Sequence, residues 1–483
     1  MHASSSGCGK RMKGSAKRSI SRPSRSLTPK DCGSQRQLAL RRQNSTTTSK
    51  PPSSDGLAGR QRERGRRKIS RRKRGGQPGH PGHCRPLVPA ERVNEIVEVF
   101  PAACRHCHHT LPSGRRVVAG VPRRHQVTEL SPIEAHITEC QYPPVVCPTC
   151  GKTTQAPVPE EHEGQFGPQL TALIAYLTVV CRLPRSVVQR LLEGALQISI
   201  SLGSTQNAWE EASAAVAAPC QEVQQVLPQQ AVLNCDETGH RTNGQRRWLW
   251  TLVAPTFIFY TIATSRGSDV LRRLLGATFA GILGSDRLPT YLTYASGLRQ
   301  LCWAHFTRNL LSPEELATTA PAKRFCREAL AFQRQLFRLW HRFRGDPHIR
   351  GMLLTRTQLI AKALPIEKKF FALADRYVNA ANDDVRNLAR ALFLHHQHFF
   401  TFVHEDGVEP TNNSAERALR TAVQWRKIMF GNRSHVGEVA VARLLTVTRT
   451  CQMQQLDALV YLTAAIRCHR RRQVAALLLP KET

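Results

Sequence analysis

The chain has 483 residues, a formal net charge of +34 at pH 7 and a pI of about 10.6. This length allows about two to four domains with proper cores. So large a positive charge favours nucleic acid as the partner, or less often an anionic membrane surface. Because the chain has no run of about 18 apolar residues and no apolar signal core at its N-terminus, a membrane or secreted protein is not expected, and we expect a cytoplasmic one.

Residues 1–90 are expected to form a disordered basic arm and linker. They contain 23 Lys and Arg residues against 3 acidic ones, and too few apolar residues to bury a core. The run 60–74 suits contacts with phosphate groups, although an ordinary solvated tail is the alternative. The candidate DNA contacts are Arg66, Arg67, Lys68, Arg71, Arg72, Lys73 and Arg74.

Residues 91–160 contain a candidate zinc site. The pairs Cys104/Cys107 and Cys147/Cys150 both have CxxC spacing, which lets the two sulfurs of a pair reach one ion. Four cysteines would hold a structural Zn²⁺ with no open position for chemistry. Strands are predicted at residues 93–99, 124–130 and 135–139, so the segment is predicted to be zinc-ribbon-like. Unliganded or redox cysteines are the alternative; disulfides are not expected among fifteen cysteines without a signal peptide.

Residues 161–228 have helical periodicity. Apolar residues from Leu170 to Val180 predict one helix, and Pro184 opens a second that ends at Gly194. A third is expected to begin with Ser204 as its cap. This pattern fits a DNA-binding helix-turn-helix, and it fits equally well a helical hairpin packed on the next domain.

The chain is predicted to be a multidomain α/β protein, with residues 229–440 as its catalytic domain. Strands are expected at 231–235, 247–253, 257–262 and 281–284, with a helix at 269–275 before the last strand. Three antiparallel strands, a helix and a strand parallel to the first form a ribonuclease-H-like arrangement. Residues 311–403 are predicted to be a helical insertion, in which three histidines form a polar face. Residues 441–483 are predicted to be a helical, basic C-terminal segment.

Three carboxylates are candidate catalytic residues. Asp236 and Asp286 follow apolar strands that are expected to be neighbours, and Glu416 lies on a later helix. Three such groups can hold two Mg²⁺ (or Mn²⁺) ions about 3.5–4 Å apart, an arrangement used for in-line attack on phosphorus. Without metal, carboxylates this close would repel one another.

Each carboxylate also has a structural alternative. The two aspartates are typical of turns at strand ends. Asn413 and Glu416 have the spacing of a helix capping box. Glu237 and Asp269 are alternative metal ligands near the first aspartate.

The chain resembles the transposases of the bacterial insertion-sequence 66 family, which have a DDE catalytic core of ribonuclease-H-like fold. The resemblance runs from about residue 44 to the C-terminus through Ser49-Lys50-Pro51-Pro52-Ser53-Ser54-Asp55, Gly75-Gly76-Gln77-Pro78-Gly79-His80, both CxxC pairs, Asp236-Glu237-Thr238, Ser285-Asp286, Cys302-Trp303-Ala304-His305 and Asn412-Asn413-x-x-Glu416-Arg417. It implies that Asp236, Asp286 and Glu416 are the catalytic triad, and that the four cysteines form a zinc-binding domain contributing to DNA binding. The leucine-rich helix with which family members usually begin is reduced to residues 37–42.

The resemblance also implies a function. The triad would free a 3′-hydroxyl on one DNA strand and then use it to attack target DNA. Arg417, Arg420, Arg426 and Lys427 would contact phosphates near the site, unless they are ordinary surface residues. The expected partners are element ends and target DNA, accessory proteins of the same element and further copies of the chain, on the bacterial nucleoid. A nuclease or resolvase on the same fold, or an inactive remnant that only binds DNA, are the alternatives. His305 has no assigned role. A hydrogen bond to a residue that binds the metal, or a contact with phosphate, is compatible with its place in the motif.

Overall fold

The computed structural model describes residues 86–111, 114, 120–159, 164–294, 296–316, 319–349 and 351–479. The seven candidate DNA contacts of the basic arm lie outside this part of the chain. None of the helices in the described residues is long and apolar enough to cross a membrane.

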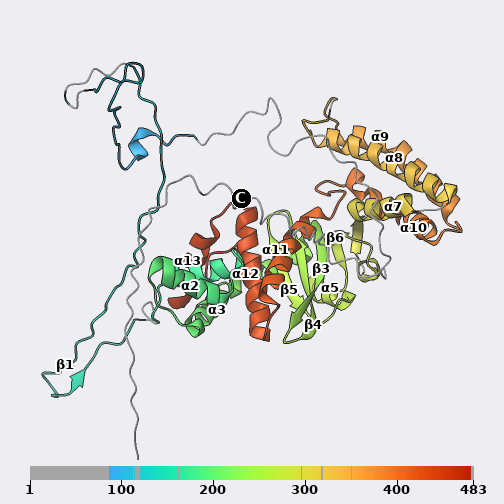
Figure 1. Cartoon of the computed structure of the whole chain (residues 1–483). Coiled ribbons are helices and arrows are strands. Elements are labelled where there is room, and N and C mark those ends of the chain that lie inside the picture. The colour runs from blue at the N-terminus through green and yellow to red at the C-terminus, as the bar shows by residue number, and fades with distance from the viewer. Residues whose placement is uncertain are drawn as a thin grey trace, which may run out of the picture. The chain divides into compact units, whose positions relative to one another are not determined.

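A five-stranded mixed sheet carries the candidate catalytic residues (Figure 1). Its strands are β3 (Val232–Thr242), β4 (Gln245–Val253), β5 (Ile258–Ala263), β6 (Phe279–Ser285) and β7 (Ser296–Leu301), in the order β5-β4-β3-β6-β7. The first three are antiparallel neighbours, and β6 and β7 run parallel to β3. Helix α5 (Ser268–Leu275) joins β5 to β6, and α6 (Pro289–Thr293) joins β6 to β7. The predicted order of three antiparallel strands, a helix and a parallel strand is confirmed.

Strand β3 is longer than the sequence pattern indicates. The predicted strand ended at Cys235, but β3 continues through Asp236 to Thr242 before a turn at Asn243 and Gly244. Its second half is polar yet largely buried, and distant residues are partners of two of its side chains, Glu237 and His240. His240 Nε2, for example, lies 2.6 Å from Asn432 Oδ1. Asp236 is therefore inside a strand and not in a turn at its end.

Strand β7 was not anticipated, since Ser296–Leu301 contains a buried arginine and glutamine. The Arg299 guanidinium donates to the carbonyls of Tyr291 and Tyr294. Gln300 accepts the Phe402 N–H at 2.8 Å. A pattern search for apolar residues cannot find a strand whose polar side chains are paired by distant segments.

Four helices between β7 and α11 form a second core (Figure 1). They are α7 (Trp303–Leu316), α8 (Ala320–Phe343), α9 (Arg356–Tyr377) and α10 (Asp383–His404), so the helical stretch begins at Trp303 and not at residue 311. Trp303 is fully buried and its indole N–H donates to the Phe399 carbonyl at 2.6 Å. Its ring packs against those of Phe306, Phe337, Phe370, Phe399 and Phe400, with centroid distances of 5.2–6.2 Å.

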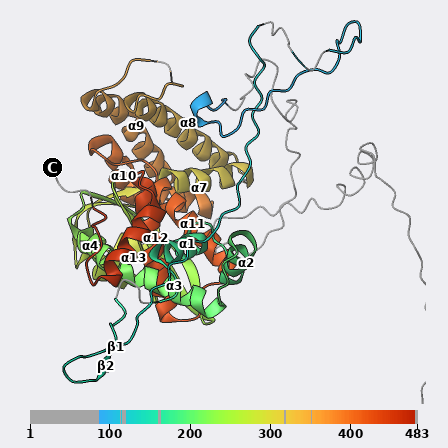
Figure 2. The ribbon, with the colours of Figure 1, turned by 90° about the vertical axis from the view of Figure 1, so that its left-hand side faces the viewer.

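The remaining helices pack around the sheet and around one another (Figures 1 and 2). They are α1 (Pro168–Val179), α2 (Arg185–Leu196), α3 (Leu202–Ala215), α4 (Ala217–Gln225), α11 (Asn413–Met429), α12 (His435–Met453) and α13 (Ala458–Arg470). Helix α11 lies on β3 and β4, and α12 covers the edge strand β5, where the Thr446 and Thr450 hydroxyls accept backbone N–H groups.

The early helices α1 and α3 pack against α12 and α13. This is the hairpin packing that the sequence allowed; a DNA-binding role for the same helices stays a prediction. Two details differ from expectation. The second helix passes Gly194 and ends at Leu196, and the third begins at Leu202, with Ser201 as the cap that accepts the Ser204 N–H at 3.0 Å.

The three strands predicted around the CxxC pairs are wrong. Residues 93–99, 124–130 and 135–139 form no ladder, and the strands of this segment are the short pair β1 (Val145–Val146) and β2 (Thr153–Thr154). Val99, Val127 and Ile137 are 88%, 82% and 86% exposed. An alternating pattern specifies a strand only where a second layer buries its apolar face, and here no such layer is present among the described residues.

Truncation of Trp303 should destabilise the helical block strongly. Trp303→Ala removes a fully buried ring and is expected to cost about 3–5 kcal/mol. Leu394→Ala on α10 is the control, because Leu394 is 71% exposed and its loss should cost no more than about 0.5 kcal/mol. Denaturant unfolding followed by tryptophan fluorescence and circular dichroism measures both; equal effects would contradict the packing described.

Candidate active site

Asp236 and Asp286 occupy equivalent positions on neighbouring parallel strands. The register of β3 and β6 pairs Val232 with Ile282 and Asn234 with Gly284, so each aspartate lies two residues beyond the last pair. Gly284 permits this close approach, since a Cβ there would lie 2.3 Å from Asn234 Oδ1. Both aspartates are half-buried.

Backbone donors orient the two aspartates. Asp236 Oδ1 accepts the N–H of Glu237 at 3.0 Å. Asp286 directly follows β6, and its Oδ1 accepts the N–H of Leu288 at 2.9 Å, which closes the turn leading to α6. In each carboxylate Oδ2 has no such backbone bond among the described residues, which leaves one oxygen for another ligand.

Glu416 is brought to these aspartates by Asn412. The Asn412 amide donates to the carbonyl of Cys235 at 2.8 Å, next to Asp236, and its backbone N–H donates to Cys302 Sγ at 3.1 Å. Asn412 is the residue before α11 and makes no side-chain cap bond, and Glu416 is the fourth residue of the helix. The capping-box explanation of Glu416 is therefore wrong.

The far end of α11 is also fixed to β3. Asn432 donates its N–H to the Arg241 carbonyl at 3.0 Å, and its own carbonyl accepts the Asn243 N–H at 2.8 Å. A helix tied at both ends to one strand cannot slide along it. Glu416 is thereby held near the middle of the sheet.

The acidic groups influence one another electrostatically. The pKa of Asp236 is raised well above its ordinary 3.8, first because burial desolvates the carboxylate, and then because Glu237, Asp286 and Glu416 are negative. Glu416 Oε1 is buried and accepts no hydrogen bond from the described residues. Oxygen donors of this kind are the ligands that Mg²⁺ and Mn²⁺ prefer, and a divalent ion would offset the repulsion. The three carboxylates thus suit the expected metal ions by their chemistry, although the ligand atoms of Asp236, Asp286 and Glu416 do not all lie within 4.8 Å of one another.

Glu237 and Asp269 are both engaged elsewhere. Glu237 Oε1 pairs with Arg266 at 2.7 Å, and its Oε2 accepts the Tyr291 hydroxyl. Asp269 accepts the Ser265 hydroxyl at 2.7 Å at the exposed start of α5. Because other side chains already bind both of these carboxylates, Asp236 is the better candidate for the metal ligand.

His305 approaches Glu416 more closely than the sequence suggests. Its Nδ1 lies 3.3 Å from Glu416 Oε1, a contact that becomes an ion pair when the imidazole is protonated. Cys302 Sγ, His305 and Glu416 offer ligand atoms that all lie within 4.8 Å of one another. Sequence spacing places Cys302 and His305 one helical turn apart, but it gives no sign that Glu416 would join them.

Basic residues surround the acids unevenly. Arg417, Arg420 and Lys427 are exposed on α11, whereas Arg426 is half-buried and desolvation lowers its pKa. Arg287 was missed by the sequence analysis. It is half-buried beside Asp286, its guanidinium lies 5.4 Å from the centre of the Phe306 ring, and burial lowers its pKa although Asp286 opposes that effect.

Each CxxC pair is in a tight turn. The Cys104 and Cys147 carbonyls accept the N–H groups of His108 and Gly151, both at 2.9 Å. The pKa of the Cys104 thiol is lowered chiefly by the backbone N–H of Cys107, and the pKa of the Cys147 thiol chiefly by the backbone N–H of Cys150. The structure does not bring the two pairs together: among the described residues, the three-ligand group within 4.8 Å is the one around Glu416.

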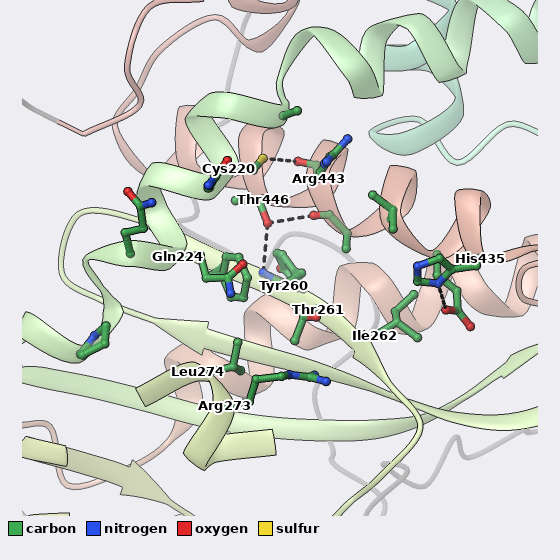
Figure 3. A pocket seen from close by; sticks show the side chains of 18 residues that line it. Cys220, Gln224, Tyr260, Thr261, Ile262, Arg273, Leu274, His435, Arg443 and Thr446 are labelled. Atoms are coloured by element: carbon green, nitrogen blue, oxygen red, sulfur yellow. Dashed lines mark hydrogen bonds and ion pairs between the residues drawn. The ribbon is translucent and has the colours of Figure 1, made fainter. Parts of the chain in front are cut away.

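A large cavity lies away from these acids (Figure 3). It has a volume of about 770 Å³ and lies between α4, β5, α5 and α12. Figure 3 shows Gln224, Tyr260, Arg273, His435 and Arg443 around it. Asp236, Asp286 and Glu416 are not part of its lining, so the candidate active site does not lie in this cavity.

Comparison with known proteins identifies the family. The transposase IS66 family matches residues 163–440, more than half of the chain, and the chain belongs to this family. A family of unknown function (DUF6444) matches residues 33–86. An uncharacterized protein, y4qI, of Sinorhizobium fredii (strain NBRC 101917 / NGR234) is 23% identical over 243 residues, which cover 46% of this chain and 43% of that protein. The chain thus matches less than half the length of this relative.

Loss of the Asn412 amide should loosen α11 from β3. Asn412→Ala leaves the buried Cys235 carbonyl without its donor and is expected to cost about 1–3 kcal/mol. Asn413→Ala is the matched control: Asn413 is the exposed first residue of the same helix, and its change should stay within about 0.5 kcal/mol. Denaturant unfolding would contradict this role of Asn412 if the two variants were equally stable.

The raised pKa of Asp236 predicts a pH-dependent stability in metal-free protein. The folded state holds this proton more tightly than the unfolded state, so its contribution is full below pH 3.8 and is lost as the pH rises through the folded-state pKa. With chelator at pH 7, Asp236→Asn should therefore melt above the wild type, and the difference should shrink towards acidic pH.

Mg²⁺ supplies the second half of that test. It should raise the melting temperature of the wild type, since ligands that bind the folded state stabilise it, and it should leave Asp236→Asn nearly unchanged. Thermal scans over pH, with and without Mg²⁺, measure both effects. An Asn variant that melts below the wild type in chelator would show that Asp236 is not repelled by its neighbours.

Proposed function

We propose that this protein is a DNA strand transferase that moves an insertion sequence by metal-dependent phosphoryl transfer. The membership of the IS66 transposase family supports DNA as the substrate. The observation that supports the proposal is the placement of Asp236 and Asp286 at equivalent positions beyond the β3–β6 register, together with the Asn412 bond to Cys235, which attaches the helix of Glu416 to the strand of Asp236.

The sheet order supports a ribonuclease-H-like catalytic core. Three antiparallel strands continue into two strands parallel to the first. Of the proposed acids, Asp236 lies in β3, Asp286 follows the neighbouring β6, and Glu416 lies on α11, which packs on β3 and β4. Helices α7 to α10 fit the predicted insertion between the second and third acids. In this account the insertion supplies His305 next to Glu416.

Asp236, Asp286 and Glu416 would hold two Mg²⁺ or Mn²⁺ ions. When bound, such ions activate the attacking oxygen and stabilise the leaving oxygen at phosphorus. The half-buried position of the acids limits competing water, and Asn412 keeps Glu416 in place. The same arrangement serves hydrolysis that frees a 3′-hydroxyl and the attack of that hydroxyl on target DNA, since both are in-line displacements at phosphorus.

Basic groups would bind the DNA backbone around the site. Arg417 and Arg420 are exposed on α11 within about one turn of Glu416, and the exposed Lys427 and the half-buried Arg426 lie in the last turn of the same helix. The basic arm and the cysteine segment, as the sequence predicts, would bind element ends. We propose further that Zn²⁺ draws the pairs Cys104/Cys107 and Cys147/Cys150, which lie apart in this structure, into one structural site. In each turn, backbone N–H groups lower the pKa of the first thiol and so favour the thiolate that zinc binds.

Replacement of Asp236 should abolish DNA cleavage and joining. Asp236→Asn is expected to lower the rate by more than about 100-fold. Replacing a residue that only hydrogen-bonds to a metal ligand typically costs roughly 10–100-fold. Asp269→Asn is the matched control, an aspartate on α5 with an exposed partner, and should keep wild-type activity. The assay follows labelled element ends with Mg²⁺ on a gel.

The same gel separates the alternatives. Cleaved but unjoined ends would identify a nuclease or resolvase. Binding without cleavage in the wild type would identify an inactive DNA-binding remnant. Equal joining by wild type and Asp236→Asn would remove Asp236 from the active site.

The zinc proposal predicts tightly bound metal in purified protein. Elemental analysis should find zinc, and one equivalent per chain should be lost when Cys104 and Cys147 are both changed to Ser. Cys220→Ser and Cys451→Ser are controls, since both thiols are buried between helices outside the CxxC segment. Wild-type protein that contains no zinc would contradict the site.

A further inference from the structure

A group of soft and hard ligands lies beside the proposed magnesium site. Cys302 follows β7, His305 lies in the first turn of α7, and Glu416 is on α11. Their sulfur, nitrogen and oxygen ligand atoms lie within 4.8 Å of one another. A sulfur, an imidazole and a carboxylate suit zinc-like ions, whereas Mg²⁺ prefers oxygen ligands alone.

Backbone hydrogen bonds hold the three ligands in place. The Cys302 N–H donates to the Ser285 carbonyl at 2.9 Å, and the next residue, Trp303, donates to the Pro410 carbonyl at 3.0 Å. The Asn412 N–H donates to Cys302 Sγ at 3.1 Å. Burial raises the pKa of the Cys302 thiol, and this hydrogen bond opposes that effect. Residues from β6, β7, α7 and α11 are thereby fixed around one point.

Two of the ligand atoms have unsatisfied bonding capacity. His305 Nδ1 and Glu416 Oε1 are buried atoms that form no hydrogen bond with the described residues, although they lie 3.3 Å apart. Buried polar atoms without partners are costly and uncommon. An ion between them and Cys302 would bind both atoms at once.

We propose that Cys302, His305 and Glu416 bind a zinc-like divalent ion that competes with magnesium for Glu416. Binding needs only these three side chains and exchanges the thiol proton for the metal. The consequence rests on the proposed function: with Glu416 turned to the soft ion, Zn²⁺ inhibits DNA cleavage. The site therefore links activity to the supply of free zinc.

Cobalt binding tests the site without any DNA. The protein is the full chain with all four CxxC cysteines changed to Ser, so that the remaining sulfur-to-cobalt charge-transfer absorption reports other thiolates. We expect one Co²⁺ per chain with this absorption, displaced by Zn²⁺. Cys302→Ser should abolish the absorption, and His305→Gln should weaken Co²⁺ binding by more than about 100-fold, beyond the effect of a residue behind a ligand.

Controls separate ligand loss from misfolding. Cys451→Ser removes a buried thiol of α12 and should keep the absorption. Because Cys302 is buried, circular dichroism and melting of each variant are measured, and His305→Gln gives an independent result at a half-buried position. No charge-transfer absorption in the parent, or absorption that survives Cys302→Ser, would overturn the site.

A second measurement tests the competition. In gel assays with Mg²⁺, Zn²⁺ should inhibit the wild type, and the half-inhibiting concentration should rise at least about tenfold in Cys302→Ser, normalised to the zinc-free rate of each protein. An unchanged half-inhibiting concentration would overturn the competition. If the proposed function failed and no cleavage occurred at all, cobalt binding would still test the site itself.

Discussion

Asn412 is buried where three distant segments of the chain meet. Its side chain holds the carbonyl of Cys235 in β3, and its backbone holds the sulfur of Cys302 at the end of β7. These two bonds place the start of α11 against the middle of the sheet, and with it Glu416. The helical block between Cys302 and Asn412 can vary in length without moving Glu416, because both of its ends are fixed at this point. Much of the geometry of the candidate site depends on this one residue.

The same convergence brings negative charges together at a cost in free energy. Burial and neighbouring acids raise the pKa of Asp236, so the ionised, metal-free site opposes folding. Packing elsewhere must offset this opposition, and the aromatic cluster around Trp303 and the two-ended attachment of α11 are suited to that role. Because a divalent ion would offset the repulsion among these carboxylates, that repulsion favours the binding of such an ion. Glu237 escapes this conflict because Arg266 and Tyr291 satisfy it.

Much of the sheet could be predicted from the sequence. Apolar β4, β5 and β6 and the amphipathic α5 carry clear patterns, and their order placed Asp236 beside Asp286. Where partners are distant, the pattern fails. His240 in the polar half of β3 and Gln300 in β7 are paired with Asn432 and Phe402, which no local window contains. Conversely, the alternating residues near Val127 predicted strands that have nothing to pack against. Local reasoning alone explained Glu416 as a helix cap, and only the tertiary role of Asn412 removes that explanation. No local pattern predicts the contact of His305 with Glu416. The contact depends on the hydrogen bond between Asn412 and Cys302, which are 110 residues apart in the sequence.

The central claim is that Asp236, Asp286 and Glu416 surround one pair of divalent ions. A crystal structure of the protein with Mn²⁺, with an anomalous difference map recorded at the manganese edge, tests it most directly. The account predicts two peaks about 3.5–4 Å apart, in contact with the oxygens of all three residues. Peaks that touch only surface acids, or a Glu416 side chain that points away from both aspartates, would contradict it.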